Sequence, residues 1–249
     1  MDKIAKRYLP CVLGNTKYSD VFITDLSDVG NLLVVCPDVD KKARYLAVLM
    51  HSIASFQSPH DVDFIYFGNH PVVRQTQTEL GLRDYYGNGD EGQTSVTVGM
   101  IMETFNMMSE RYETLKQHGC KNIVDYNSTI ASEGNAEMMS YEVILIDEIK
   151  NNFTEMDKDV VDMFGKIATY GRCCGIHIIA GTSYTTPDVL NGYVKTWLCQ
   201  NRVVFKVPSL VDSYVCFDRQ GAESLGDEEA LYSNLSDDYS VFYRIQPFF

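Results

Sequence analysis

The amino-acid sequence predicts an α/β fold with a mainly parallel central sheet flanked by helices on both faces. Short runs that are apolar on both faces, such as 31–36 and 143–146, match strands buried inside a parallel sheet. Between them lie segments whose apolar residues recur at three- and four-residue spacing, as in helices. Strands that alternate with helices along a chain build a parallel sheet. The 249 residues and 45% apolar content suffice for one domain, expected to span 1–249.

The expected strands and helices alternate along the chain. Strands are expected at 31–36, 62–67, 95–98, 141–147, 175–181, 201–207 and 239–245. Helices are expected at about 41–56, 100–117 and 157–170, with a short helix at 208–214. The second helix is expected to end at Gly119, and the segment 127–138, rich in Ser, Gly, Asn and Glu, to be an exposed loop. A stripe on the second helix fits core better than a partner surface, and its members are Met102, Phe105, Met108, Tyr112 and Leu115.

Charge and cysteine content narrow the class of protein. The chain has 34 acidic and 21 basic residues, a net charge of −13. Such a surface repels phosphate backbones and disfavours a nucleic-acid partner, although acidity also simply keeps a cytosolic domain soluble. Seven cysteines without a CxxC pair favour a reducing compartment over a disulfide framework. No metal site is expected, because the five histidines lack metal-ligand spacing.

Targeting segments are not expected in this chain. The longest apolar runs are far shorter than the ~20 residues that a membrane-spanning helix needs. The first residues are charged and no apolar stretch of a signal peptide follows them.

The strongest motif is the apolar run 143–146 followed by Asp147 and Glu148. In nucleoside-triphosphate hydrolases an Asp at the carboxyl end of such a strand orients magnesium and its water. The Glu that follows it polarises the attacking water, and the pair is known as the Walker B motif. A strand that simply ends at the solvent gives the same pattern. Asp147 and Glu148 are therefore candidate nucleotide-site residues that need a second motif.

That second motif is a phosphate-binding loop with the pattern GxxxxGK[ST], the Walker A motif. Its glycines let backbone N–H groups surround the phosphates, its Lys neutralises charge, and its Ser or Thr binds magnesium. The matching segment is 36–43, in which Lys42 takes the lysine position. Cys36 and Lys41 replace the two glycines, and Ala43 has no hydroxyl for the metal. The loop has therefore lost most of its phosphate-binding chemistry.

The charges in this segment also oppose phosphate. Asp38 and Asp40 place negative charge where phosphate would lie, and Pro37 removes one N–H donor. Like charges at such short range repel by several kcal/mol, even when partly screened. No bound cofactor is expected, and ATP with magnesium would bind only weakly.

The order of several motifs resembles the FtsK/SpoIIIE family of hexameric motor ATPases over nearly the whole chain. The resemblance implies a RecA-like P-loop NTPase fold. The matching segments are 9–14 (LPCVLG), 21–26 (VFITDL), 30–35 (GNLLVV), 111–113 (RYE) with 122–127 (NIVDYN), 171–177 (GRCCGIH), 188–192 (DVLNG) and 220–223 (QGAE).

The chain also departs from this family's pattern. The sensor Gln of the family falls at Ser183, and the closing GxGD loop is degenerate around 225–228. The resemblance implies that Arg172 contacts the nucleotide of a neighbouring subunit. A structural salt bridge is an equally good interpretation of Arg172.

One branch of the family fits these departures. DNA-pumping members need a cationic channel, which a net charge of −13 does not favour. The chain is most similar to degenerate modules of the EssC/EccC coupling proteins of type VII secretion, in particular the C-terminal module of EssC from type VIIb systems. The resemblance implies a module excised from a larger protein at the cytoplasmic face of the bacterial membrane, anchored by a region outside this chain. Its partners would be secreted WXG100-type proteins and other ATPase modules of the same chain and oligomer, with no nucleic acid.

Three functional hypotheses follow. The first is a non-hydrolysing module that binds secreted substrates or regulates active neighbouring modules, and that is inactive as an ATPase in isolation. The second is a weak nucleotide binder that a neighbouring module completes, with Lys42, Asp147, Glu148 and Ser183 as its residues. The third is a structural module that sets the oligomeric state of the motor.

Overall fold

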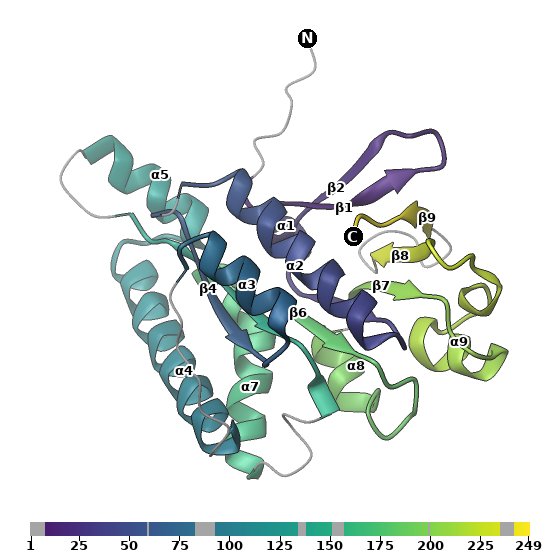
Figure 1. Ribbon diagram of the computed structural model, residues 1–249. Coiled ribbons are helices and arrows are strands. Elements are labelled where there is room, and N and C mark those ends of the chain that lie inside the picture. The colour runs from purple at the N-terminus through teal and green to yellow at the C-terminus, as the bar shows by residue number, and fades with distance from the viewer. Residues whose placement is uncertain are drawn as a thin grey trace.

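The computed structural model describes residues 8–58, 60–82, 93–133, 138–150, 157–198, 200–234 and 242–249. Within them, nine strands form one sheet in the order β2-β1-β9-β8-β7-β3-β6-β5-β4 (Figure 1). The strands are Pro10–Thr16 (β1), Val21–Asp25 (β2), Leu32–Val35 (β3), Val62–Phe67 (β4), Tyr141–Ile146 (β5), Ile176–Thr182 (β6), Asn201–Phe205 (β7), Ala230–Asn234 (β8) and Tyr243–Gln246 (β9). The α-helices are Leu26–Val29 (α1), Val39–Ser55 (α2), Pro71–Glu79 (α3), Gln93–Gln117 (α4), Ile123–Glu133 (α5), Lys158–Tyr170 (α7), Gly192–Leu198 (α8) and Leu210–Phe217 (α9), with 3-10 turns at Gly171–Cys174 (η1) and Ala222–Ser224 (η2).

The sheet is mixed. Strands β7, β3, β6, β5 and β4 run parallel to one another. Strands β8, β9, β1 and β2 extend the sheet through antiparallel pairs. The predicted α/β class is therefore confirmed, with a central parallel part, and the sheet is mixed rather than purely parallel because antiparallel strands extend it.

Helices cover both faces of the parallel strands, as predicted. In β3, Leu33 and Val35 belong to one buried cluster, while Leu32 and Val34 belong to the other. Successive strand residues point to opposite faces, so a strand that is apolar throughout is buried on both. Helices α2 and α3 lie over one face, and α4 and α7 over the other (Figure 1).

The predicted strand at 95–98 is wrong, because these residues lie in the first turns of α4. The β-branched pattern of this segment suggested a strand, but propensity is a weak prior that packing overrides. The helix packs against α7 and buries Ile101, Thr104, Met108 and Leu115, which recur at three-, four- and seven-residue spacing. Gly119, with a φ of 67°, follows the helix end as predicted.

Two further expectations are corrected on this side of the sheet. Met102 and Tyr112, assigned to the core stripe of α4, are exposed. The expected loop at 127–138 is helical up to Glu133, because Tyr126 and Ile130 bury one face of α5. Residues 134–137, and residues 239–241 of the strand expected at 239–245, lie outside the described residues.

Candidate functional site

The order of the parallel strands brings the predicted site residues together. Strand β6 lies between β3 and β5, and all three run in the same direction. Their carboxyl ends therefore meet at one edge of the sheet, where α/β proteins bind ligands. Lys42 comes from the helix that follows β3, Asp147 and Glu148 follow β5, and Ser183 follows β6.

Helix α2 begins two residues before the expected start, and this places Lys42 in its first turn. Asp38 is the N-cap residue, and its Oδ1 accepts a hydrogen bond of 2.8 Å from the backbone N–H of Lys41. Aspartate is among the residues that most favour this position, because its side chain satisfies an N–H that has no partner inside the helix. The carboxylate of Asp38 therefore takes one of the N–H groups that a phosphate-binding loop directs at its ligand.

The Lys42 ammonium is buried against the Walker B carboxylates. Its Nζ lies 3.0 Å from Glu148 Oε2 and 3.7 Å from Asp147 Oδ1. The same Nζ donates to Ser183 Oγ at 2.9 Å. Only 1% of the Lys42 side chain is exposed. A buried charge requires a partner of opposite charge and further hydrogen bonds, and Lys42 has both.

Glu148 is held by four donors from three segments. Beyond Lys42, its Oε1 accepts from Thr182 Oγ1 at 2.8 Å, and its Oε2 accepts from the backbone N–H of Ser183 at 2.8 Å. The backbone N–H of Lys150 is a longer contact of 3.3 Å. A carboxylate with this many donors is fixed in position. Thr182 completes this arrangement, although no motif in the sequence marks it as a site residue.

Asp147 is less well compensated than Glu148. Burial raises the pKa of the Asp147 carboxyl, an effect that the Lys42 ammonium opposes. Its Oδ1 accepts no hydrogen bond from the described residues. The backbone around it is tightly packed: a Cβ on Gly181 of β6 would lie 2.6 Å from the carbonyl oxygen of Asp147. Only glycine is therefore compatible with this approach between β6 and the end of β5.

Other residues of the segment 36–43 also contact the protein itself. Lys41 Nζ donates to the backbone carbonyl of Asp227 at 2.5 Å, which ties α2 to the segment 225–228. Asp40 lies 3.1 Å from His70 Nε2. The groups that would bind phosphate and magnesium thus have partners within the chain, and Ala43 adds no hydroxyl at the metal-ligand position.

Arg172 is not brought to this cluster. It lies in η1, immediately before β6, and so at the opposite edge of the sheet from Ser183. Its Nε donates to the carbonyl of Ser27 at 3.0 Å, and its exposed side chain lines a cavity of about 530 Å³ together with Lys121 and Tyr170. No carboxylate among the described residues forms an ion pair with it. Contact with a neighbouring subunit's nucleotide stays a prediction.

The family follows from a comparison with known proteins. The model of the FtsK/SpoIIIE family matches residues 3–189, about three quarters of the chain. The chain belongs to this family. A DNA translocase FtsK from Chlorobaculum tepidum is 29% identical over 235 residues, which cover 91% of this chain and 28% of that protein. The chain thus spans little more than a quarter of this FtsK/SpoIIIE relative.

Several solved structures share the fold. A conjugation coupling protein TcpA of pCW3 with ATPγS superposes with a TM-score of 0.73, covering 98% of this chain and 67% of that one at 16% identity. EssC from Geobacillus thermodenitrificans (ATPases 2 and 3) gives a TM-score of 0.72 over 99% of this chain and 46% of that one, at 16% identity. EccC from Thermomonospora curvata (ATPases 2 and 3), in complex with a signal sequence peptide, gives 0.65 over 99% and 42%, at 11% identity.

Two further facts concern the described part of this FtsK/SpoIIIE chain. Among the described residues, none of the helices has the length and apolar character needed to cross a membrane. The same residues include no group of three or more His, Cys, Asp or Glu side chains that could hold a metal ion.

Proposed function

We propose that this chain is a non-hydrolysing FtsK/SpoIIIE module of a type VII secretion motor. It would bind secreted WXG100-type substrates, regulate active ATPase modules beside it, or do both. Its place would be the cytoplasmic face of the bacterial membrane, as part of a longer protein. The observation that carries the proposal is the ion pair between Lys42 and Glu148, together with the bond from Lys42 to Ser183.

The physical argument rests on competition for the same groups. A nucleotide that binds through Lys42 has to pull a buried ammonium away from Glu148 and Ser183, and breaking a buried ion pair costs about 3–5 kcal/mol. The phosphates would also meet the carboxylate of Asp38 at the start of α2. The residues present therefore do not fit ATP with magnesium by the usual route, so we expect no turnover and weak binding.

Charge and structural similarity favour a protein substrate. A net charge of −13 opposes a DNA backbone. The solved EccC structure that shares this fold contains a signal sequence peptide, and EssC gives a similar superposition. The curated DNA translocases are nevertheless similar in sequence, so binding of DNA is an outcome that the experiments must include.

A second candidate function is an atypical nucleotide binder that a neighbouring module completes. The positions of Lys42, Asp147 and Glu148 favour it, because the lysine lies beside the two carboxylates that would hold the magnesium and water of a bound nucleotide. The TcpA structure with ATPγS shows that the fold accommodates a nucleotide in that protein. Arg172, exposed at the other edge of the sheet, would then contact the nucleotide of an adjacent subunit.

Turnover tests the non-hydrolysing assignment. We expect phosphate release from ATP in the presence of magnesium to stay at the level of a protein-free control. Robust turnover that Asp147→Ala abolishes would contradict the assignment, and it would favour the second candidate.

Substrate capture tests the proposed partner. Candidate WXG100-type proteins are passed over the immobilised domain, with and without their C-terminal tails, alongside duplex DNA. We expect retention of a full-length secreted protein, loss of retention without its tail, and no retention of DNA at physiological salt. Retention of DNA alone would overturn the proposal of a secretion module.

A further inference from the structure

A second cavity lies at the amino ends of the parallel strands, at the opposite edge of the sheet from the Lys42 cluster. The Lys42 cluster comprises Lys42, Asp147, Glu148, Thr182 and Ser183. This second cavity, the η1 cavity, has a volume of about 530 Å³, and its walls come from α1, the start of α5, the start of β5, the end of α7 and η1. Its volume is ordinary for a ligand site. None of its described lining residues belongs to the Lys42 cluster.

The described lining of the η1 cavity carries more positive than negative charge. Arg172 and Lys121 are exposed cations, and neither forms an ion pair within the described ranges. Asp28 is the acidic residue of this lining. The nearby carboxylates of Asp25 and Asp125 already accept hydrogen bonds from backbone N–H groups. An anion that enters the cavity therefore meets two cations and one carboxylate.

The amino terminus of α5 adds partial positive charge to this lining. Asn122 precedes the helix, and its Oδ1 accepts from the backbone N–H of Asp125 at 2.9 Å. This cap satisfies one N–H of the first turn, while the N–H groups of Ile123 and Val124 have no partner among the described residues. Both residues line the cavity. Free N–H groups at a helix amino terminus bind anions, because they donate hydrogen bonds at the positive end of the helix dipole.

The hydroxyl of Tyr141 points to a ligand independently of the helix. Tyr141 is the first residue of β5 and lines the cavity, but only 6% of it is exposed. Its hydroxyl is buried and has no hydrogen-bond partner in the part of the chain that the structure describes. Burial raises the pKa of Tyr141, and Asp25, Tyr8 and Asp28 add to this effect. Since Tyr8 and Asp28 belong to the lining, the hydroxyl end of the ring faces the cavity and keeps its proton. A ligand oxygen that accepts this proton removes the cost of a buried unpaired O–H.

Arg172 and Tyr170 suit a carboxylate on a polypeptide. The Arg172 guanidinium is held at its Nε, which donates to the carbonyl of Ser27 at 3.0 Å. Its two terminal nitrogens form no hydrogen bond with the described residues, and such a pair matches the two oxygens of a carboxylate. Tyr170 lies in the same lining and is 61% exposed. Exposed tyrosines are enriched where proteins bind other proteins, because they give a large contact area at low entropic cost.

We propose that the η1 cavity binds one carboxylate displayed by a partner polypeptide, held by Arg172, Lys121, the first turn of α5 and the Tyr141 hydroxyl. A carboxylate carries a single negative charge, which equals the excess of one cation in the described lining. A phosphate group carries about two negative charges near neutral pH, and it would lie beside Asp28 on a protein of net charge −13. The lining therefore favours a carboxylate over the nucleotide phosphates of an adjacent subunit, which are the alternative that the experiment has to include.

Methyl NMR tests the inference at the cavity itself. The protein is labelled with ¹³C at its isoleucine δ1 methyls and titrated, at low salt, with a capped five-residue peptide that carries one central glutamate between Gly and Ser residues. We expect a saturable shift at Ile123, which lines the cavity. No shift is expected at Ile146, which lies at the other end of β5 and precedes Asp147 of the Lys42 cluster. The same peptide with glutamine, which keeps the shape without the charge, should produce no saturable shift.

Two substitutions separate a built site from general attraction to a positive surface. Tyr141→Phe removes only the hydroxyl and should weaken the glutamate peptide about tenfold, the value of one hydrogen bond to a charged group. The same change should not lower stability, because this hydroxyl has no partner among the described residues. Lys121→Gln should weaken the peptide roughly threefold, because this ammonium is exposed and screened. Lys116→Gln, at an exposed lysine outside the cavity, is the matched control and should change nothing.

The inference is overturned if the glutamine peptide shifts Ile123 as much as the glutamate peptide does, or if Tyr141→Phe binds with unchanged affinity. An equal effect of Lys116→Gln and Lys121→Gln would also overturn it. ATP with magnesium is titrated in parallel. Saturation of the Ile123 shift by ATP at lower concentrations than the peptide requires, with Ile146 unchanged, would contradict the inference and indicate a site for a neighbouring subunit's nucleotide.

Discussion

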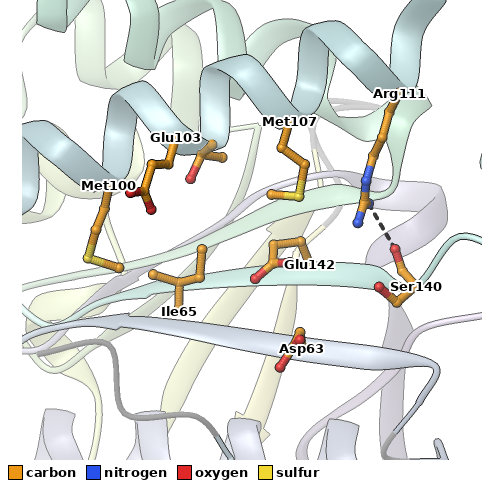
Figure 2. Close-up of a pocket in the computed structure, with 9 residues that line it drawn as sticks. Asp63, Ile65, Met100, Glu103, Met107, Arg111, Ser140 and Glu142 are labelled. Atoms are coloured by element: carbon orange, nitrogen blue, oxygen red, sulfur yellow. Dashed lines mark hydrogen bonds between the residues drawn. The ribbon is translucent and has the colours of Figure 1, made fainter. Parts of the chain in front are cut away.

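The Lys42 cluster and the α4 cavity, which Asp63, Glu103, Arg111 and Glu142 help to line (Figure 2), place charged side chains in two different environments. At the carboxyl edge of the sheet, Glu148 is matched by an ammonium, a hydroxyl and backbone N–H groups. Under α4, Arg111 instead donates to the backbone carbonyls of Ser140 and Cys174, and Glu103 is exposed. Loss of a charge should therefore cost more stability at the Lys42 cluster than at Glu103.

The largest expected effect is the loss of the Lys42 ammonium. Lys42→Met keeps the aliphatic stem and leaves Glu148 and Asp147 buried without their cation, which costs about 3–5 kcal/mol of unfolding free energy. Urea denaturation measures this cost. Lys116→Met, at an exposed lysine, is the control and should stay within about 0.5 kcal/mol of wild type. Equal losses of unfolding free energy in the two variants would show that the Lys42 cluster does not stabilise the fold.

Removal of one donor to Glu148 is the next largest effect. Thr182→Val keeps the shape of a fully buried side chain and deletes its 2.8 Å hydrogen bond to Oε1. A hydrogen bond to a charged group contributes roughly 1.5–3 kcal/mol, so we expect a loss of about 2 kcal/mol. Thr196→Val, on the exposed side of α8, deletes only a bond within the helix and serves as the reference. A cost no larger than that of Thr196→Val would contradict the assignment of Thr182 to the cluster.

The pH dependence of stability should reveal Asp147. Because burial raises its pKa, the folded protein holds a proton at pH values where the unfolded chain has released it. The free energy of unfolding therefore falls as pH rises from the ordinary carboxyl value of 3.8 through the raised value. Denaturation across this window should show the fall in wild type and a smaller one in Asp147→Asn. An identical slope in the two proteins would mean that Asp147 titrates as an exposed carboxylate.

The smallest effect on stability is expected for Glu103→Gln under α4. Unlike the changes above, this substitution should stabilise the fold if it has any effect. Glu103→Gln removes one of several like charges, so stability should stay within about 0.5 kcal/mol of wild type, with any change a gain. A gain should shrink at high salt, because the repulsion is screened. Denaturation at low and high sodium chloride, with Glu110→Gln as the control, measures it. A loss of more than about 1 kcal/mol at Glu103, roughly twice the effect of an ordinary surface substitution, would contradict this contrast between the two regions.

The sequence predicted the parallel strands because their residues are apolar on both faces, as in Leu32–Val35. It did not predict β1, β2 or β8 as strands, because short antiparallel strands with mixed polarity lack that pattern. The strand expected at 95–98 was wrong because the β-branched residues of this segment lie in helix α4, which packs on α7.

The sequence predicted which residues belong to the candidate site, but it did not predict how they are arranged. Lys42, Asp147, Glu148 and Ser183 were found from motif positions, and strand order explains why they meet. The rule that Asp precedes a helix predicts the cap formed by Asp38, whereas the motif comparison predicts only that its charge repels phosphate. Neither the inward contacts of Lys42 nor the α4 cavity follows from sequence spacing, because both depend on segments that are distant along the chain.

Isothermal titration of ATP with magnesium tests the central claim most directly, because it asks whether the Lys42 ammonium is available to a phosphate. The account predicts no saturable heat at ligand concentrations up to about 1 mM. This corresponds to a standard binding free energy less favourable than about −4 kcal/mol. The contradicting result is one-site binding with a Kd below about 10 µM that Lys42→Ala abolishes and Lys116→Ala retains.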